Sequence, residues 1–548
     1  MDSIVKAGVK QCPFIIKNSN KLVQNKQVFT DNYVKCPVFK QVTRNFTTSC
    51  PRANQASYSL NTEEKTAAQT QEKTETSQVF QYTNFMEDEL NRKRADNSYR
   101  YFNNINRIAK DFPMAHQDNT NEKVTVWCSN DYLSLSKHPK VIKKAQEIIE
   151  MYGVGAGGTR NIAGHNQHCM YLENEIAKLH KQEGALVFTS CFVANDTILT
   201  TLGKKFPNMI YISDELNHAS MITGIKNSRC VKKIFKHNDM EDLENILKSL
   251  PKEQPKMIIF ESVYSMCGSV SPIKKIVELA KKYGALTFLD EVHAMGLYGP
   301  HGAGVAEHVD FEQHLKNGLR KDPEHKTVME QIDLITGTLG KSFGSVGGYA
   351  AGSKIMIDYI RSFAAGFIFT TTLPPAAMGA AEEAINLTKK NITLRVKQQR
   401  ITNYLKLKLA QEKDIPMMKN SSHIMPVFIG DALLAKKASD MLLKKHKIYC
   451  QAINYPTVAK GTERIRVTPT PGHTFEHCDV LIEALDDVFT QLNIPRLSNY
   501  KDVADLELFE KGDGERLWTE DMLKLTNTDL QDNVFADQRE FLGSSKGY

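Results

Sequence analysis

The sequence lacks the patterns that mark metal centres and disulfide frameworks. Its ten cysteines form no C-x-x-C pair, and its 16 histidines form no cluster at metal-ligand spacing. We therefore predict no metal site. A secretory signal is also missing, because the apolar segment from Cys12 to Ile16 is too short to be one. These absences favour free thiols in a reducing compartment.

Long apolar runs and dense charge of one sign are equally scarce. The longest uncharged stretch, residues 362–381, contains three threonines and two prolines, which favours buried core and a turn over a transmembrane helix. The net charge of +7 is concentrated in residues 1–60, whereas residues 496–548 are acidic. In the rest of the chain the excess of basic residues is too sparse to form a nucleic-acid-binding surface. We expect neither a membrane span nor a nucleic-acid partner.

The leader, residues 1–78, is basic, poor in acidic residues and rich in Ser, Thr, Asn and Gln. This composition favours a mitochondrial transit peptide and import to the matrix, with a disordered cytosolic tail as the alternative. Cys12, Cys36 and Cys50 each precede a proline, and no other Cys-Pro pair occurs. A cysteine thiolate can bind haem iron, so these pairs would allow haem binding; coincidence is the other interpretation.

The body of the chain predicts an α/β fold with a mostly parallel sheet. Short apolar runs alternate with helical stretches, as crossover connections require. The runs are 185–188, 209–212, 257–260, 285–289 and 334–336. We expect an amino-terminal segment of the core at 79–140, a large domain at 141–375, a smaller α+β domain at 376–495 and an acidic extension at 496–548.

Reactive residues follow these strands, and in parallel sheets chemistry gathers at the strands' carboxyl ends. Lys341 lies in a Gly-Lys-Ser triplet, but a phosphate-binding loop needs glycine where Ile335 stands, which excludes a nucleotide hydrolase. After an apolar strand, a buried lysine can have a lowered pKa and form a Schiff base.

A carboxylate and an imidazole complete the pattern. Asp290 ends one strand and His293 follows it. A carboxylate there can keep a pyridine nitrogen protonated; alone it would be a helix cap, but with Lys341 the functional interpretation is favoured. The amides of Cys191 and Phe192, at a strand-to-helix junction, suit a phosphate. His218 could stack on a ring or be a core histidine.

Ten sequence blocks in order resemble the α-oxoamine synthases, and among them the 5-aminolevulinate synthase family in its fungal mitochondrial form. They include "GAGGTRNIAGH" (155–165), "SDELNHASMI" (213–222), "FESVYSM" (260–266), "FLDEVHAMGLYGPHGAG" (288–304), "TGTLGKSFGSVGGY" (336–349) and "GTERIRVTPTP" (461–471). The resemblance covers about residues 85–492. It implies a pyridoxal-phosphate (PLP) enzyme of fold type I, with a mostly parallel seven-stranded sheet and a smaller carboxyl-terminal α+β domain.

The resemblance also implies residue roles. Lys341 would hold PLP and act as general base, Asp290 would pair with the pyridine nitrogen and His293 with the ring oxygen. The other cofactor-binding residues would be Cys191, Phe192, His218, Ser265, Thr338, Thr370 and Thr371, the two threonines arriving from the second subunit of a homodimer. Substrate-binding residues would be Arg100, Asn130, Thr159, Asn161, Ser213, Lys232, Thr457 and Arg466.

The activity implied is an acyl transfer in which glycine condenses with succinyl-CoA to give 5-aminolevulinate, CoA and CO2, the first step of haem and porphyrin biosynthesis. Arg466 would bind the glycine carboxylate and Arg100 the succinyl carboxylate. A sibling synthase using another acyl-CoA, and a binding protein without catalysis, are the alternatives; the second is disfavoured because every key position is filled.

Overall fold

The seven-stranded sheet of the large lobe fixes the positions of Lys341, Asp290 and His293. The computed structural model describes residues 80–99, 101–322, 324–500, 508–509 and 516–530. In this sheet the strand order is β4-β10-β9-β8-β7-β5-β6, and only β10 runs antiparallel to its neighbours. The strands are β4 (Gly184–Phe188), β5 (Ile210–Asp214), β6 (Val231–Phe235), β7 (Lys256–Glu261), β8 (Leu286–Asp290), β9 (Leu334–Thr338) and β10 (Gly348–Gly352).

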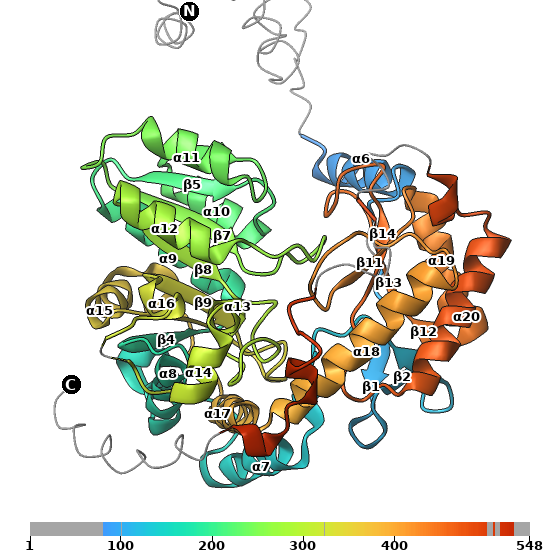
Figure 1. The fold of residues 1–548 in the computed structure, drawn as a ribbon, viewed down its shortest axis with the longest axis horizontal. Helices are drawn as coiled ribbons and strands as arrows, with labels where there is room; N and C mark the ends of the chain where they lie inside the picture. The colour runs from blue at the N-terminus through green and yellow to red at the C-terminus, as the bar shows by residue number, and fades with distance from the viewer. Residues whose placement is uncertain (1–79, 100, 323, 501–507, 510–515, 531–548) are drawn as a thin grey trace, which may run out of the picture. The chain divides into compact units, whose positions relative to one another are not determined.

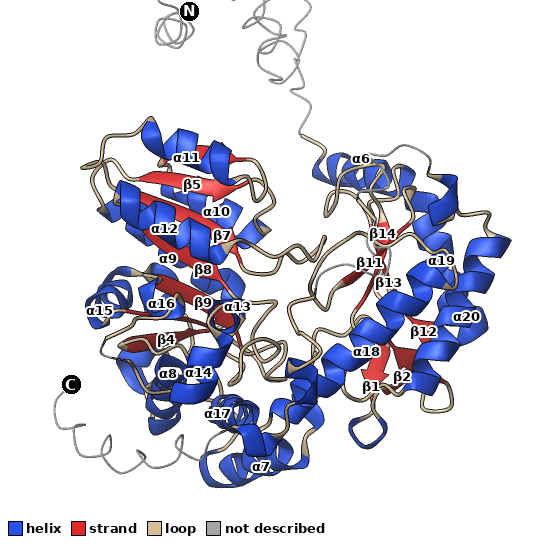
Figure 2. Ribbon diagram, in the orientation of Figure 1, coloured by secondary structure: helices blue, strands red, loops and turns tan. Residues whose placement is uncertain are grey.

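Helices cover both faces of this sheet (Figures 1 and 2). Side chains alternate along each strand, so Ile258 and Phe260 of β7 join one buried cluster and Met257 and Ile259 the other. The first cluster includes α8 (Gln167–Leu179), α11 (Met240–Lys248), α12 (Ile273–Tyr283) and α17 (Pro375–Lys390). The second includes α9 (Cys191–Lys205), α10 (Ala219–Ser228), α15 (Lys354–Phe363) and α16 (Ala365–Ile368).

A second core lies in the smaller lobe. Helices α18 (Ile392–Gln411), α19 (Ala432–His446) and α20 (Phe475–Gln491) pack on a three-stranded sheet of order β11-β14-β13. Its strands are β11 (Met425–Phe428), β13 (Gln451–Ile453) and β14 (Arg464–Val467). A four-stranded sheet of β1 (Ile105–Arg107), β2 (Met114–Gln117), β3 (Lys123–Val126) and β12 (Ile448–Tyr449) joins the chain's early and late segments.

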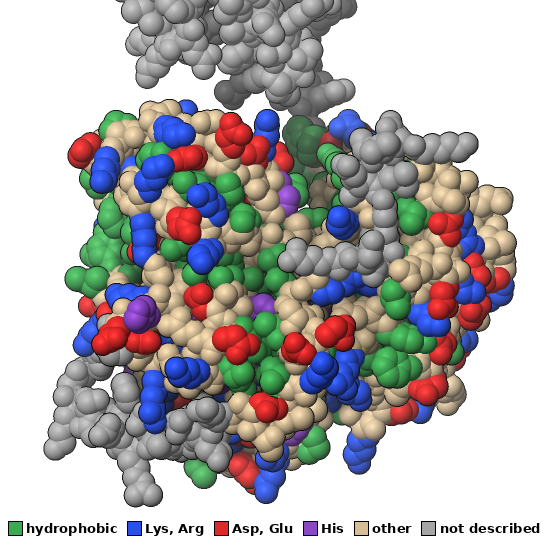
Figure 3. All heavy atoms as spheres, viewed as in Figure 1, with side chains coloured by type: hydrophobic (Ala, Val, Ile, Leu, Met, Phe, Trp, Pro, Cys, Tyr) green, Lys and Arg blue, Asp and Glu red, His purple; other side chains and the backbone are tan. Residues whose placement is uncertain are grey.

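The remaining helices are α6 (Tyr82–Ala95), α7 (Pro139–Tyr152), α13 (Val305–His308) and α14 (Phe311–Asn317), and a π-helical turn spans Arg160–Gly164. None of the helices described is long and apolar enough to cross a membrane. Figure 3 shows acidic and basic side chains interspersed over one face of the molecule.

Candidate active site

Lys341 follows β9 and meets the histidine that follows β8. Its Nζ lies 2.6 Å from His293 Nε2. Burial, together with the positive charge of Arg466, lowers the pKa of Lys341 to about 7. Burial and the neighbouring charge of Lys341 hold the pKa of His293 well below its usual range. The pair therefore offers an amine with a substantial neutral fraction near pH 7 beside a neutral imidazole, as nucleophilic or general-base chemistry needs.

Asp290, the last residue of β8, is a buried carboxylate held from two sides. Its Oδ1 accepts a hydrogen bond from Val292 N at 2.8 Å, and its Oδ2 accepts one from Asn195 Nδ2 at 2.7 Å. Among the residues described, no cationic group forms a salt bridge with it. Burial raises its pKa. A protonated ring nitrogen would supply the missing cation, so the site fits a pyridine cofactor.

The start of helix α9 provides free backbone donors close to this group. The Ser190 side chain caps the helix by accepting a hydrogen bond from Val193 N, which leaves the amides of Cys191 and Phe192 outside the helical ladder. A Cβ at Gly348 would collide with the Cys191 backbone, so only glycine lets β10 approach here. Burial raises the pKa of the Cys191 thiol, which keeps it uncharged. These features fit a phosphate group.

Two further residues predicted to bind the cofactor are fixed by local hydrogen bonds. His218 caps α10, its backbone N–H donates to the buried carboxylate of Glu261 at 2.6 Å, and its exposed ring contacts Ser220 Oγ through Nδ1 at 2.8 Å. Thr338 Oγ1 donates to Gly347 O at 3.1 Å and accepts from Gly340 N at 3.2 Å, which holds the turn that carries Lys341.

Arg466 links the small lobe to the reactive pair. From β14 it donates to Asn130 Oδ1 at 3.0 Å and to the Tyr132 hydroxyl at 2.8 Å, and one of its terminal nitrogens lies 3.4 Å from His293 Nδ1. It is buried, its Nε is unpartnered in the described structure, and no acidic side chain described there forms a salt bridge with it. A buried guanidinium in this state suits a small carboxylate.

Known proteins with similar sequences show the family to which the chain belongs. Residues 122–485 match the family described as aminotransferase class I and II. The chain is 59% identical to 5-aminolevulinate synthase, mitochondrial, of Saccharomyces cerevisiae, over 83% of this chain and 84% of that one. It is 51% identical to the protein of that name from Eremothecium gossypii, over all of both chains. The chain belongs to the 5-aminolevulinate synthase family.

Membership of the 5-aminolevulinate synthase family is consistent with a solved structure. A serine palmitoyltransferase from S. paucimobilis with bound PLP is 26% identical, with a TM-score of 0.64 over 75% of this chain and 98% of that one. The predicted family and the fold-type-I architecture with its mostly parallel seven-stranded sheet are therefore confirmed.

Other predicted residues form a second group apart from Lys341. Thr159 and Thr371 pair through an isolated antiparallel bridge, and Thr372 N donates to Gly158 O at 3.0 Å. Asn161 lies in the adjacent π-helical turn, and Thr370 Oγ1 donates to Gly366 O at 2.7 Å. In the part of the chain that the structure describes, no hydrogen bond or ion pair joins this group to Lys341.

The remaining predictions lie at separate places. Ser265 is buried in the turn after β7, and Ser213 in β5 accepts a hydrogen bond from Asn217 at 2.8 Å. Lys232 on β6 and Thr457 are exposed. Arg100, Cys12, Cys36 and Cys50 lie outside the described residues.

Sequence reasoning assigned no role to several residues that lie at this site. Tyr132 contacts His293 Nδ1 at 2.8 Å, and its ring packs edge-on against that of His423. Asn195, one helical turn after Cys191, orients Asp290. Glu261 ends β7 and anchors the cap of α10. A signal existed for two of them, because Asn195 shares a helix face with Cys191, and Glu261 ends a strand as Asp290 does.

Proposed function

We propose that this chain uses PLP to condense glycine with succinyl-CoA, giving 5-aminolevulinate, CoA and CO2, the first step of haem biosynthesis. The contact between Lys341 and His293 beside the buried carboxylate of Asp290 carries this proposal. The named relatives are mitochondrial proteins, and the basic leader of this chain is compatible with import to the matrix.

Lys341 has the properties of both cofactor anchor and base. PLP, when bound, supplies a protonated pyridine ring that stabilises negative charge on the α-carbon of an attached amino acid. Asp290 would hold the ring nitrogen, His293 the ring oxygen, and Cys191 and Phe192 the phosphate, with Ser265, Thr338 and His218 around the ring. Nζ of Lys341, whose pKa is about 7, would then accept the α-proton of glycine.

Substrate recognition rests on buried positive charge. Arg466 would bind the glycine carboxylate, and Asn130 would keep its guanidinium in place through the bond at 3.0 Å. We assign the succinyl carboxylate to Arg100, with Thr159 and Asn161, because a carboxylate removed from water needs a charged partner of fixed geometry. Ser213, Lys232 and Thr457 would contact the CoA portion.

In a homodimer with shared sites, the group formed by Thr159, Asn161, Thr370 and Thr371 would lie at the Lys341 site of the other subunit. Large apolar side chains are exposed beside that group: Val154 is 77% exposed, Ile162 85% and Phe369 77%. Exposed apolar residues gathered on one surface favour an interface, and a two-fold interface presents the same segment from both subunits. Thr370 and Thr371 would thereby reach the second subunit's cofactor.

Mixing two inactive variants tests this arrangement. We expect Lys341→Ala and Thr371→Arg homodimers to be inactive, and a co-refolded mixture to regain about a quarter of normal activity, because half of random dimers are mixed and each has one intact site. If every site lay within one chain, the mixture would stay inactive.

Borohydride reduction tests the central assignment. Reduction of the purified holoenzyme followed by peptide mapping should fix PLP to the peptide that contains Lys341. Lys341→Ala should lose the attached cofactor and about 10²–10⁴-fold of its activity, whereas Lys275→Ala, at an exposed position of α12, should lose neither. A cofactor fixed to another lysine would refute the proposal.

The acyl donor is tested by a panel of CoA thioesters. Turnover should require succinyl-CoA, and Arg100→Leu should raise the KM for succinyl-CoA far more than that for glycine. Preference for an uncharged thioester would identify a sibling synthase instead.

Haem is a further proposed ligand, at Cys12, Cys36 and Cys50. The three Cys-Pro pairs support it, because a proline disfavours helix at the cysteine before it and a cysteine thiolate can bind haem iron. Haem added to the full chain should give the absorption spectrum of thiolate-ligated iron, and replacing the three cysteines by alanine should remove it. An unchanged spectrum in the triple variant would exclude these ligands.

A further inference from the structure

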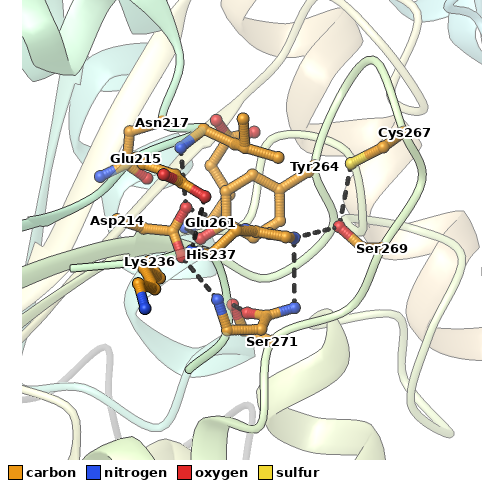
Figure 4. Close-up of polar contacts among 12 residues, drawn as sticks. Asp214, Glu215, Asn217, Lys236, His237, Glu261, Tyr264, Cys267, Ser269 and Ser271 are labelled. Carbon is orange, nitrogen blue, oxygen red and sulfur yellow. Dashed lines mark hydrogen bonds and ion pairs between the residues drawn. The ribbon is translucent and has the colours of Figure 1, made fainter. Parts of the chain in front are cut away.

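A cysteine, a histidine and an aspartate meet beyond the carboxyl ends of β5 and β6, in a cluster that the proposed reaction does not use. Figure 4 shows His237 between Asp214 on one side and Ser269 with Cys267 on the other. The Asp214 Oδ1 to His237 Nδ1 distance is 2.9 Å, and the His237 Nε2 to Ser269 Oγ distance is 2.7 Å. Ser269 Oγ lies 2.9 Å from Cys267 Sγ. The order is carboxylate, imidazole, hydroxyl, sulfur.

Hydrogen bonds from two backbone N–H groups hold the Asp214 carboxylate in place beside the His237 ring. Its Oδ1 also accepts a hydrogen bond from Leu216 N at 2.9 Å, and its Oδ2 accepts one from Asn238 N at 3.1 Å. The Asn238 side-chain amide, 3.3 Å from His237 Nε2, has the Val270 carbonyl as its own acceptor at 3.1 Å. The ring of His237 is therefore held with one nitrogen toward the Asp214 carboxylate and the other toward the Ser269 hydroxyl.

The electrostatics favour a charged pair. Burial lowers the pKa of His237, but the hydrogen bond with Asp214 and the nearby Cys267 thiol outweigh burial and raise that pKa to about 9. Burial raises the pKa of the Cys267 thiol, but the nearby His237 imidazole and the hydrogen bond with Ser269 bring that pKa below its ordinary value. A protonated imidazole can donate from both nitrogens, through the Ser269 hydroxyl to a thiolate.

Acidic and basic side chains both lie near His237 and Cys267. The Tyr264 ring meets that of His237 edge-on at 4.4 Å, and Glu215 Oε1 accepts from His237 N at 2.9 Å. Arg464 donates to the Met266 carbonyl at 3.0 Å. The titratable and charged groups that face the pair are Asp214, Glu215, Glu261, Tyr264 and Arg464.

Access distinguishes Cys267 from most other cysteines. Of the seven described, Cys169, Cys191, Cys450 and Cys478 are buried, whereas Cys128, Cys230 and Cys267 are partly exposed. Burial raises the pKa of Cys128 to about 12. The Cys230 thiol donates to the Gly203 carbonyl at 3.0 Å and has no hydrogen bond to a histidine among the described residues. Cys267 alone among the three is linked to an imidazole through a hydroxyl.

We propose that Cys267 is a nucleophilic thiolate and a modification site for low-molecular-weight disulfides such as glutathione disulfide. The thiolate attacks one sulfur of the reagent, the sulfur–sulfur bond of the reagent breaks, and one glutathione thiolate leaves. A mixed disulfide between Cys267 and glutathione remains, and no further oxidant is needed. His237 and Asp214 stabilise the attacking thiolate.

Site-resolved alkylation of the holoenzyme tests the thiolate. The full chain is treated with limiting iodoacetamide between pH 5.5 and 9, digested, and the peptides of Cys267 and Cys230 are quantified by mass spectrometry. We expect Cys267 to react at least about tenfold faster than Cys230 at pH 7, because an ordinary thiol is only a few per cent ionised there. Equal rates, or labelling of Cys267 only after denaturation, would overturn the proposal.

Two variants separate the imidazole's effect from simple exposure. His237→Gln should slow alkylation of Cys267 about tenfold at pH 7, and Ser269→Ala should slow it less, with the Cys230 rate unchanged in both as a check on folding. Glutathione disulfide should then add one glutathione to the Cys267 peptide of the parent chain, removable by dithiothreitol. An adduct distributed equally between Cys267 and Cys230, or none on Cys267, would contradict the assignment.

Discussion

Lys341 is the residue whose protonation most directly controls cofactor capture. Its pKa of about 7 in the structure lies below the ordinary 10.5, because it is buried and faces Arg466. The neutral amine attacks an aldehyde, and it predominates above the pKa. The rate at which the cofactor-free chain acquires PLP absorbance should therefore rise between pH 5.5 and 8 with a midpoint near 7. Arg466→Gln should move that midpoint upward; an unmoved midpoint would contradict the electrostatic cause.

Asn195 is a positioning residue for Asp290. Its amide donates to Asp290 Oδ2 at 2.7 Å and to Ser220 Oγ at 3.1 Å. A hydrogen bond to a charged group contributes about 1.5–3 kcal/mol, so Asn195→Ala should lower kcat about 10–100-fold and shift the visible absorption band of bound PLP. Thr200→Ala, on the same helix, is the control. A loss of stability with an unshifted band would indicate a merely structural role.

At the scale of elements, a buried carboxylate holds the glycine-rich turn that follows His293. Glu307 on α13 accepts from Ala303 N at 2.8 Å and contacts His301 Nδ1 at 2.7 Å. Burial raises the pKa of Glu307, but His301 outweighs burial and lowers that pKa to about 2. A Cβ at Gly299, where φ is 81°, would collide with this carboxylate. The turn and the helix therefore depend on each other.

Replacing this carboxylate should cost stability in a pH-dependent way. The folded pKa lies below the ordinary 4.5, so the contribution is present above pH 4.5 and is lost as the pH falls toward 2. Glu307→Gln should lower the free energy of unfolding by about 3 kcal/mol at pH 7, with the two proteins converging in acid. Denaturant unfolding measures this, and exposed Glu312→Gln should change little. A difference that stays constant with pH would contradict the argument.

The apolar content of each strand explains which elements could be predicted from the sequence. Five buried apolar runs became β4, β5, β7, β8 and β9, because strands covered on both faces read as continuous apolar segments. Strand β10, "GYAAG", was not predicted, since its small residues give no apolar signal. Strand β6, "VKKIF", was not predicted either, because it is an edge strand with exposed lysines.

The positions of the strand ends also explain which site residues could be predicted. Lys341, Asp290 and His293 could be predicted because they stand where parallel strands end, and the structure places Lys341 against His293. Tyr132 and Arg466 come from segments more than 300 residues apart, and only tertiary packing joins them. Asn195, within helix α9, donates a hydrogen bond to the carboxylate of Asp290, which lies 95 positions later in the sequence. No local pattern encodes such pairings.

At the scale of the whole molecule, the acidic carboxyl-terminal segment is tied to both lobes. Trp518 is buried, its Nε1 donates to Leu297 O at 3.1 Å, and its ring packs against those of His308 and Phe311 in the large lobe. Further along, Arg400 on α18 donates to Leu523 O at 2.7 Å. Trp518, together with the buried Leu523 and Leu530, is thus an apolar anchor of residues 516–530.

Removing that anchor should release the segment while the core stays folded. Trp518→Ala should cost about 3–5 kcal/mol of docking free energy, because a large buried aromatic leaves a cavity. Protease cleavage within residues 516–530 should then accelerate at least about tenfold, since cleavage follows the population of the open form. Thr528→Ala, on the exposed side of the same segment, should leave the rate within about twofold. Equal cleavage of both variants would mean that contacts other than the indole, such as the hydrogen bond from Arg400 to Leu523 O, hold the segment.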